Sequence, residues 1–466
     1  MSTSFEYSLL RSFCKSVKKL KAPEICSALI SRASLMDVLR IANLDCKNIK
    51  NINVPSEDFP RWQKQNKKHK DSTVTFTRRT NVEYYHEIAE LANPLLANVS
   101  FEAVCNESRK HWVVNNTNMT EKLEAIRTAS ILKLKKKPKL NSPVEALSLN
   151  YIIIISPEYH LDYSVDLTQW EKVVKTCKKI YLKEEESVKK DEWRMIKDSI
   201  DEFSSWCNSS ISSIQESIDE TKVPAEYKKN GNYKRTINMF NNIIQHISYN
   251  WDTKKLSENT FINQIIDPII VAFLDKENPA IMYKGSDSEL QESKERKFEQ
   301  ARVNNHDTTN IKGRIPDRSA YVTSTSSNNH HIFLCEVKTE SCSNGRPDLV
   351  KLGSMMKDCI DNAIKKGIRD YFAVGLLVEG RTATLYSASL PSEGVYALVA
   401  MDTFFIPTSS KDMDTLVSTS RGMIKCRALV VKAASIISND DSNEEPNLGM
   451  IRKSCSSPSH HTEYYM

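Results

Sequence analysis

Two segments of the chain decide the fold: GRIPDRSAYV (residues 313–322) and HIFLCEVKT (residues 331–339). The segment TSTSSNNH between them consists of turn-forming residues, so the three together predict a β-hairpin. Pairing Asp317 with Glu336 places the centre of this hairpin in the middle of the turn segment. Because residues directly opposite each other in an antiparallel pair are close neighbours, this register puts the two carboxylates side by side.

The two carboxylates define a candidate catalytic site together with Lys338. Glu336 and Lys338 are two residues apart on one strand, so both project from the same face. Adjacent carboxylates raise each other's pKa unless a cation intervenes, and Mg²⁺, or Mn²⁺ in its place, is such a cation with oxygen ligands. A lysine beside the metal can orient an attacking water or stabilise charge in the transition state. The pattern therefore predicts metal-assisted hydrolysis of phosphodiesters.

A third carboxylate, Glu258, lies at the start of the segment SENTFINQIIDPIIVAF (residues 257–273). Ser257 is a favourable residue for the N-cap of a helix that carries an apolar stripe. Glu258 begins this buried face, which directs its side chain towards the sheet. The alternative is that Glu258 only stabilises the positive end of the helix dipole. The sequence alone leaves both interpretations open.

Further elements follow the hairpin in the chain. The segment PDLVKLGSMMKDCIDNAIKKG (347–367) predicts a helix whose apolar face consists of Leu349, Leu352, Met356, Cys359 and Ala363. Asp348 is its predicted N-cap, and Lys351 is expected on a solvated flank, with contact to the substrate phosphate as the alternative. Three strands are predicted at 371–380, 381–390 and 394–407. The polar segment 284–310 carries no predicted helix or strand. His330 and His331, which precede the Glu336 strand, are interpreted as turn residues.

These residues and their order resemble the PD-(D/E)XK nuclease superfamily. The residues that match its motif, with eighteen residues between the aspartate and the glutamate, are Pro316, Asp317, Glu336, Val337 and Lys338. Glu258 matches the acidic residue that many members carry on the first core helix. The resemblance covers residues 255–405, with 280–284 as the candidate first strand, and extends to nuclease-like families of some fungi.

The resemblance implies a restriction-endonuclease-like α/β core in which a mixed sheet is flanked by helices. It also implies that Asp317, Glu336, the backbone carbonyl of Val337 and Glu258 hold the metal, while Lys338 activates water. The expected function is Mg²⁺-dependent hydrolysis of nucleic acid. The alternative is an inactive module that uses the same fold to bind nucleic acid or protein.

Charge is distributed unevenly along the chain, whose formal net charge is +6. Residues 1–140 hold 25 Lys and Arg against 14 Asp and Glu, a difference of +11, and such an excess favours polyanions. The residues predicted to contact nucleic acid are Lys67, Lys68, Lys70, Arg78, Arg79, Lys135, Lys136 and Lys137. DNA is favoured over RNA. The alternatives are a solvated surface, a nuclear localisation signal or a protein-interaction bundle.

The expected organisation is α+β overall, in four parts. These are a basic, mainly helical region (1–140), a helical or linker region (141–235), the nuclease-like domain (236–410) and a disordered tail (436–466). No run approaches the ~20 apolar residues of a membrane helix, and the first residues lack the apolar core of a secretory signal. The 11 Cys include no CxxC pair, which disfavours a disulfide scaffold or zinc site. The expectation is an intracellular protein, with the nucleus favoured over the cytoplasm.

Overall fold

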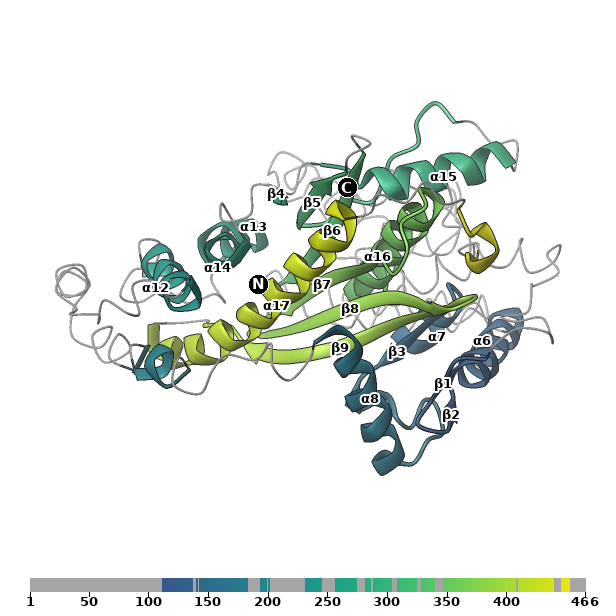
Figure 1. The fold of residues 1–466 in the computed structure, drawn as a ribbon, viewed down its shortest axis with the longest axis horizontal. Coiled ribbons are helices and arrows are strands. Elements are labelled where there is room, and N and C mark those ends of the chain that lie inside the picture. Colours follow the sequence, from purple (N-terminus) through teal and green to yellow (C-terminus); the bar gives the residue numbers. More distant parts are fainter. Residues whose placement is uncertain are drawn as a thin grey trace, which may run out of the picture. The chain divides into compact units, whose positions relative to one another are not determined.

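The structure is a computed structural model, and it describes most of the chain from residue 111 onward. The described residues are 111–136, 140, 142–182, 193–198, 200–201, 231–244, 256–274, 281–285, 288–303, 308–324, 328–339, 347–407, 410–439 and 446–452. All of them belong to one compact unit, Arg78–Met466. This unit mixes helices and strands, as expected, around a seven-stranded sheet (Figure 1).

The sheet has the strand order β3-β9-β8-β7-β6-β5-β4. Its strands are β3 (Ile152–Ile155), β4 (Ile281–Lys284), β5 (Arg318–Thr323), β6 (Asn329–Lys338), β7 (Phe372–Glu379), β8 (Thr382–Ser392) and β9 (Val395–Phe405). The pairs β3–β9 and β6–β7 are parallel, and the other neighbours are antiparallel. The sheet is therefore mixed, as the sequence predicted.

Helices pack on both faces of this sheet. The helices of the described chain are α6 (Met119–Lys136), α7 (Pro143–Ser148), α8 (Leu167–Tyr181), α12 (Gly231–Ile244), α13 (Glu258–Phe261), α14 (Asp267–Leu274), α15 (Gln291–Val303), α16 (Pro347–Lys365) and α17 (Leu416–Ser438). Shorter elements are β1 (Val113–Val114), β2 (Thr117–Asn118), η2 (Pro157–Tyr159), the π-helical turn η5 (Ile262–Ile266), η7 (Ser410–Thr415) and η8 (Leu448–Met450).

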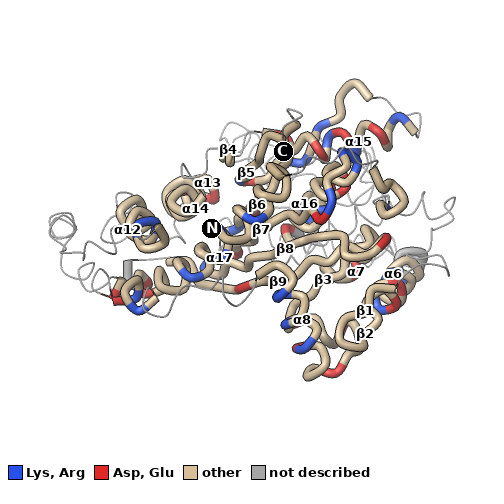
Figure 2. The backbone as a smooth tube through the Cα atoms, in the orientation of Figure 1, with Lys and Arg blue, Asp and Glu red and all other residues tan. Residues whose placement is uncertain are grey.

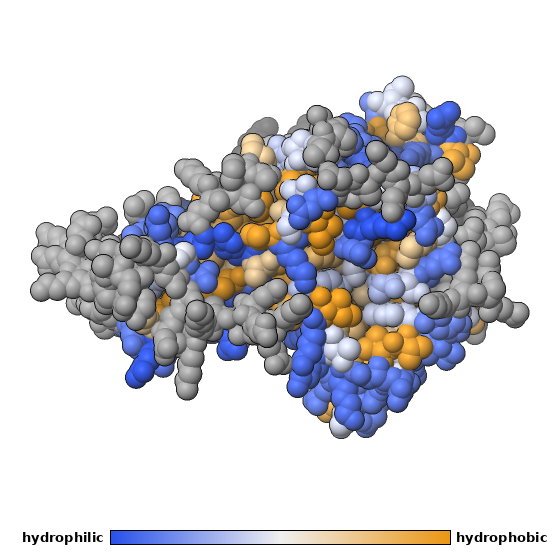
Figure 3. Space-filling view, in the orientation of Figure 1, coloured by the Kyte–Doolittle hydropathy of each residue, from blue (hydrophilic) through white to orange (hydrophobic). Residues whose placement is uncertain are grey.

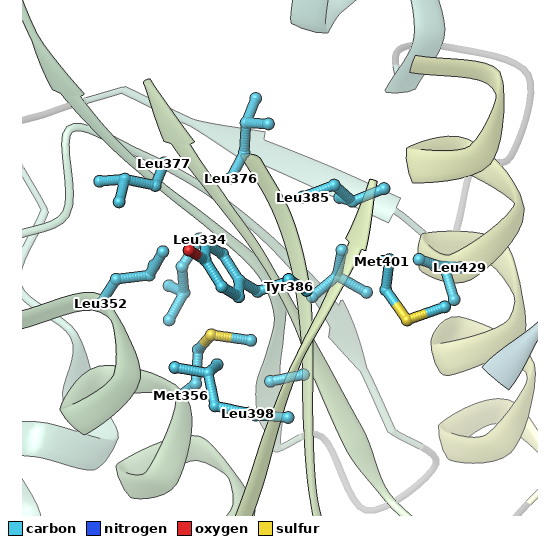
Figure 4. Packing of buried hydrophobic residues seen from close by; sticks show 14 of the residues in the cluster. Leu334, Leu352, Met356, Leu376, Leu377, Leu385, Tyr386, Leu398, Met401 and Leu429 are labelled. Atoms are coloured by element: carbon cyan, nitrogen blue, oxygen red, sulfur yellow. The ribbon is translucent and has the colours of Figure 1, made fainter. Parts of the chain in front are cut away.

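Two long helices bury the two faces of the central strands. Leu352 and Met356 of α16 pack on one face of the sheet, beside Leu334 of β6 (Figure 4). Leu429 of α17 packs on the opposite face, beside Met401 of β9. The apolar face predicted for the helix at 347–367 is thus confirmed, and burying it against strands that are apolar on both faces is the main source of stability.

The predicted hairpin is confirmed in its register. Arg318 pairs with Cys335 and Ser319 with Leu334, as the predicted register requires, and a bulge between Ala320 and Tyr321 shifts the pairing by one residue towards the turn. The strand expected at 280–284 and the helix expected at 257–273 are also present, the helix as α13, η5 and α14 in succession.

Four expectations need correction. Helix α15 occupies the segment expected to be only polar, and its charged residues are partly buried there: Glu292 is 3% and Lys297 6% exposed. A helix that buries charged groups lacks the apolar stripe by which helices are recognised. His330 and His331 lie inside β6 and are buried, so they are strand residues and not turn residues.

The packed unit also extends beyond the predicted nuclease-like domain (236–410) at both ends. Strand β3, from the region expected to be helical or linker, pairs with β9, and α17 covers one face of the sheet. The parallel partner of β9 lies more than 200 residues earlier in the chain, a pairing that local patterns do not reveal.

The expected disorder from residue 436 does not hold for the described residues of that tail. Gly394 donates a backbone hydrogen bond to Met450 (3.0 Å), and the buried Lys357 ammonium donates to the carbonyl of Arg452 (2.7 Å). A buried ammonium needs acceptors, and this segment supplies one.

Charged residues of both signs are interspersed along α15 and α16 (Figure 2). The face shown in Figure 3 alternates hydrophilic and hydrophobic residues across its coloured part. Across the described part of the chain, no helix combines the length and apolar character needed to cross a bilayer.

Candidate active site at the end of strand β6

Asp317 lies just before β5 and is joined to β6 on both sides of Glu336. Its backbone N–H donates to the carbonyl of Cys335 (3.1 Å), and its Oδ2 accepts the N–H of Val337 (2.7 Å). These two bonds hold the Asp317 carboxylate against the strand at the level of Glu336. The predicted proximity of the two residues is therefore present in the structure.

Glu336 is the most buried acid of the site, with only 1% of its surface exposed. Its Oε2 accepts a hydrogen bond from Lys351 Nζ (2.7 Å). Its Oε1 is buried and has no hydrogen-bond partner among the described residues. Burial raises the pKa of Glu336 to about 8, although the Lys351 ammonium acts in the opposite direction. An unpaired buried carboxylate oxygen is costly, so a native structure that keeps one calls for an explanation.

Lys338 and Glu258 form an ion pair across the sheet and the first core helix. Lys338 Nζ lies 3.1 Å from Oε1 and 3.0 Å from Oε2 of Glu258. The Ser257 hydroxyl caps the helix by accepting the N–H of Thr260 (3.1 Å), as predicted. Of the two interpretations that the sequence left open, the one that directs Glu258 towards the sheet is confirmed.

Two residues of α16 join this group, and the sequence interpretation placed both elsewhere. Asp348 lies in the first turn of α16, which begins at Pro347, and is buried; it was expected as an N-cap. Lys351 was expected on a solvated flank or near the substrate phosphate; its ammonium pairs with Glu336, and its side chain is 32% exposed. The available signal was their i, i+3 spacing on the first turn after the strand, which puts both on one helix face.

The electrostatics of the two lysines follow from these neighbours. Burial opposes the charge on Lys338, but the carboxylates of Asp348 and Glu258 raise its pKa above the ordinary value. Burial also opposes the charge on Lys351, and Glu336 raises its pKa. Both side chains therefore remain ammonium ions at neutral pH.

We call the six residues the acid–lysine cluster: Glu258, Asp317, Glu336, Lys338, Asp348 and Lys351. Four carboxylates and two ammonium groups leave a formal charge of −2. Among the described residues, no group of three or more His, Cys, Asp or Glu side chains has the geometry of a metal site. Glu258 in particular is directed at Lys338 and not at the Asp317–Glu336 pair.

A second network connects Asp317 to the first core helix. The Arg318 guanidinium contacts both oxygens of Asp267 (2.5 Å each) and Asn263 Oδ1 (2.8 Å), and its Nη1 donates to the carbonyl of Asp317 (2.6 Å). Tyr283 of β4 donates to Asp267 Oδ1 (2.8 Å). The π-helical turn η5 contains Asn263 and directly precedes Asp267. This network fixes the start of β5 relative to the helix that carries Glu258.

Of the other predicted site residues, three lie within the described part of the chain and six lie outside it. Val337 lies in β6 with a buried side chain, and its N–H contacts Asp317. Lys135 and Lys136 end helix α6. The remaining predicted nucleic-acid contacts, Lys67, Lys68, Lys70, Arg78, Arg79 and Lys137, lie outside the described residues.

The arrangement can bind a cation at its buried acids and can present two fixed ammonium groups to an anion. The buried Glu336 carboxylate beside Asp317 provides oxygen ligands of the kind that hard divalent cations prefer. Lys338, with 28% of its side chain exposed, is within reach of solvent. Comparison with family models, curated proteins and solved structures finds no match to this chain.

Proposed function

We propose that the acid–lysine cluster is the active site of a metal-dependent nuclease with a restriction-endonuclease-like core. The observation that carries the proposal is the buried Glu336 carboxylate, whose Oε1 has no partner among the described residues, held beside Asp317 by the hairpin register. The catalytic acids, the lysine two residues on and the helix acid Glu258 come together from three separate elements. Ionisable groups with raised pKa values that converge from separate elements are typical of functional sites.

The residues fit a divalent cation in part. Asp317 and Glu336 would hold it, and the orphaned Oε1 is the atom that gains a partner. With Glu336 ionised, the state that a bound cation favours, the cluster has a formal charge of −2, which one divalent ion neutralises. When bound, Mg²⁺ or Mn²⁺ would supply charge neutralisation and a more acidic water. Glu258 and the Val337 carbonyl remain proposed ligands whose roles depend on the metal-bound state.

The lysines have separate roles in this proposal. Lys338, held by Glu258, is placed to orient water or to stabilise the charge that develops on the phosphoryl oxygens. Lys351 neutralises Glu336 through its ion pair and keeps that carboxylate in position. The substrate is nucleic acid, with DNA favoured, and the site of action is the nucleus. The basic N-terminal region would add affinity through phosphate contacts.

A second candidate is a module that binds nucleic acid or protein without cleaving it. It is favoured by the lysine pairing of both glutamates, because each ammonium already does part of what a metal would do.

One assay separates the two candidates. The full-length protein and its Glu336→Gln variant are incubated with plasmid, single-stranded DNA and RNA, with Mg²⁺, Mn²⁺ or EDTA. The nuclease proposal expects cleavage by the wild type with metal only, and none by the variant. Equal cleavage by both proteins identifies a contaminant and contradicts the assignment. Binding without cleavage under any metal supports the second candidate.

A further inference from the structure

A row of side chains crosses the sheet from Lys338 to its far strands. In register, Lys338 of β6 pairs with Glu379 of β7, Glu379 with Thr382 of β8, and Thr382 with Phe405 of β9. Residues paired in register project from the same face of a sheet. Phe405 therefore lies on the face that carries Lys338 and Glu336, because its neighbour Phe404 packs against Gly422 of α17 on the other face.

The far end of this row is an exposed aromatic ring beneath a guanidinium. Phe405 is 45% exposed, and Arg381 Cζ lies 5.2 Å from the centre of its ring. Arg381 is exposed in the turn between β7 and β8. The exposed phenyl ring and the guanidinium above it form a cation–π pair. Both groups are flat, so either can also stack on a flat ligand.

The backbone holds both ends of the row in place. Gly380 donates a hydrogen bond to the carbonyl of Lys338 (2.7 Å), and Ile406 donates to the carbonyl of Arg381 (2.8 Å). The hydroxyl of Thr419, on α17, donates to the carbonyl of Phe405 (2.6 Å). The turn that carries Arg381 is thus fixed to the strand end that carries Lys338. The Arg381–Phe405 pair therefore lies at the same end of the strands as the candidate active site.

We infer that Arg381 and Phe405 form a stacking platform for an unpaired base of single-stranded DNA whose phosphate backbone reaches Lys338. The inference rests on the proposed function and specifies its substrate class. Cationic and aromatic side chains set along one groove are how proteins hold single strands, because every base has a face on which to stack. Three strand spacings of ~4.8 Å put the platform ~14 Å from Lys338. That distance equals roughly four stacked nucleotides at ~3.4 Å each.

A double-stranded substrate fits this row less well. Its bases are paired and stacked inside the duplex, so a protein ring reaches a base face only after unstacking. Glu379 lies in the row between the two cations and offers an acidic group where a phosphate would need a donor. A flexible single strand can pass beside this acid, whereas the regular phosphates of a duplex cannot adjust in the same way.

The test measures binding in EDTA, so that it does not depend on cleavage. Fluorescence anisotropy follows a labelled single-stranded DNA oligonucleotide, and a duplex of the same sequence, with the full-length protein. Phe405→Ala and Arg381→Ala are each expected to weaken binding of the single strand by at least about fivefold. The duplex affinity is expected to stay within about twofold. Matched controls are Phe298→Ala on α15, where the ring is also 45% exposed, and the exposed Arg421→Ala on α17.

A second variant guards against a trivial loss of structure. Phe405→Trp keeps the platform, so it should bind the single strand as the wild type does and lose tryptophan fluorescence on binding. The inference is overturned by a wild type that does not bind the single strand, by equal losses in the control variants, or by equal losses for the duplex. A protein that cleaves DNA while the platform variants bind normally refutes the platform alone. A protein that never cleaves but shows these losses refutes the nuclease alone.

Discussion

At each end of strand β6 a buried glutamate pairs with a nitrogen of a histidine or lysine side chain. The two ends differ in whether both oxygens of the glutamate have a partner. At the first end, His331 Nδ1 lies 2.9 Å from both oxygens of Glu292, and both residues are buried. At the other end, Glu336 has one oxygen on Lys351 and one without a partner among the described residues. One end is a closed pair, and the other is an open one.

The difference separates a structural role from a functional one. Burial opposes ionisation of Glu292, yet its hydrogen bonds with His331 hold its pKa below the ordinary value. The same burial raises the pKa of Glu336 to about 8, because Lys351 compensates only part of it. A satisfied buried pair fixes α15 to the sheet. An unsatisfied buried carboxylate costs folding free energy, and a bound cation would remove part of that cost.

The largest expected effect is at the closed end. Glu292→Ala leaves the buried His331 ring nitrogen without its acceptor, and removing one partner of a buried pair destabilises a protein by about 3–5 kcal/mol. Urea unfolding at pH 7 measures this loss. The control is Glu299→Ala on the same helix, where an exposed ion pair with Lys365 contributes less than about 1 kcal/mol. Similar losses in the two variants would mean that the closed pair does not stabilise the fold as argued.

The second effect is on turnover at the open end. Lys338→Ala should lower the cleavage rate by ~10²–10³, the usual result of losing one group that stabilises a transition state, with folding and Mg²⁺ affinity nearly unchanged. Asp317→Asn should lose Mg²⁺ binding as well as activity. Cleavage rates and metal titrations of both variants are compared with Lys365→Ala, an exposed lysine of α16. If Lys338→Ala cleaves at the wild-type rate, Lys338 has no catalytic role in the wild-type protein.

A smaller effect is expected at Arg318, and it tests whether the Arg318–Asp267 contact positions the acids of the open end. Arg318→Lys keeps the charge but loses the two-pronged contact with Asp267, so the start of β5 is held less firmly. Residues that orient the ligands of a metal typically change affinity or activity by about 10–100-fold when altered. The expected signature is a higher Mg²⁺ requirement, which excess Mg²⁺ partly restores. A loss of stability with an unchanged Mg²⁺ requirement would make Arg318 purely structural.

The sequence predicted the open end well because its signals are local. The hairpin register, the Glu258 helix and the helix at 347–367 each follow from spacing and periodicity within about twenty residues. The closed end was missed, since Glu292 and His331 are 39 residues apart and Glu292 lies in no apolar pattern. The contacts of Asp348 and Lys351 could not be predicted for a related reason. A charged residue at a helix start usually faces solvent, and only the tertiary packing of α16 on β6 brings these two to the other acids.

Near the closed end, the buried Lys297 shows how much folding free energy a buried charge costs. Lys297 of α15 is buried, and its Nζ donates to the carbonyl of Lys312 (2.9 Å). Burial, with repulsion from Arg314 and Arg296, lowers the pKa of Lys297 to about 7. Between pH 7 and its ordinary pKa near 10.5, the unfolded chain binds a proton that the folded chain does not. Stability should therefore rise with pH above 7, by at most about 1.4 kcal/mol per pH unit.

Lys297→Met tests this directly, because the variant has a side chain of similar length and no titrating group. Urea unfolding at pH 7, 8 and 9 should show rising stability for the wild type and a flatter profile for the variant. Lys294→Met, on the same helix but more exposed, is the control and should keep the wild-type slope. Parallel profiles for the wild type and Lys297→Met would show that Lys297 keeps its proton in the folded state. Its neighbours would then compensate the charge of Lys297 as fully as His331 compensates that of Glu292. Burying these charges near the closed end would then cost no folding free energy.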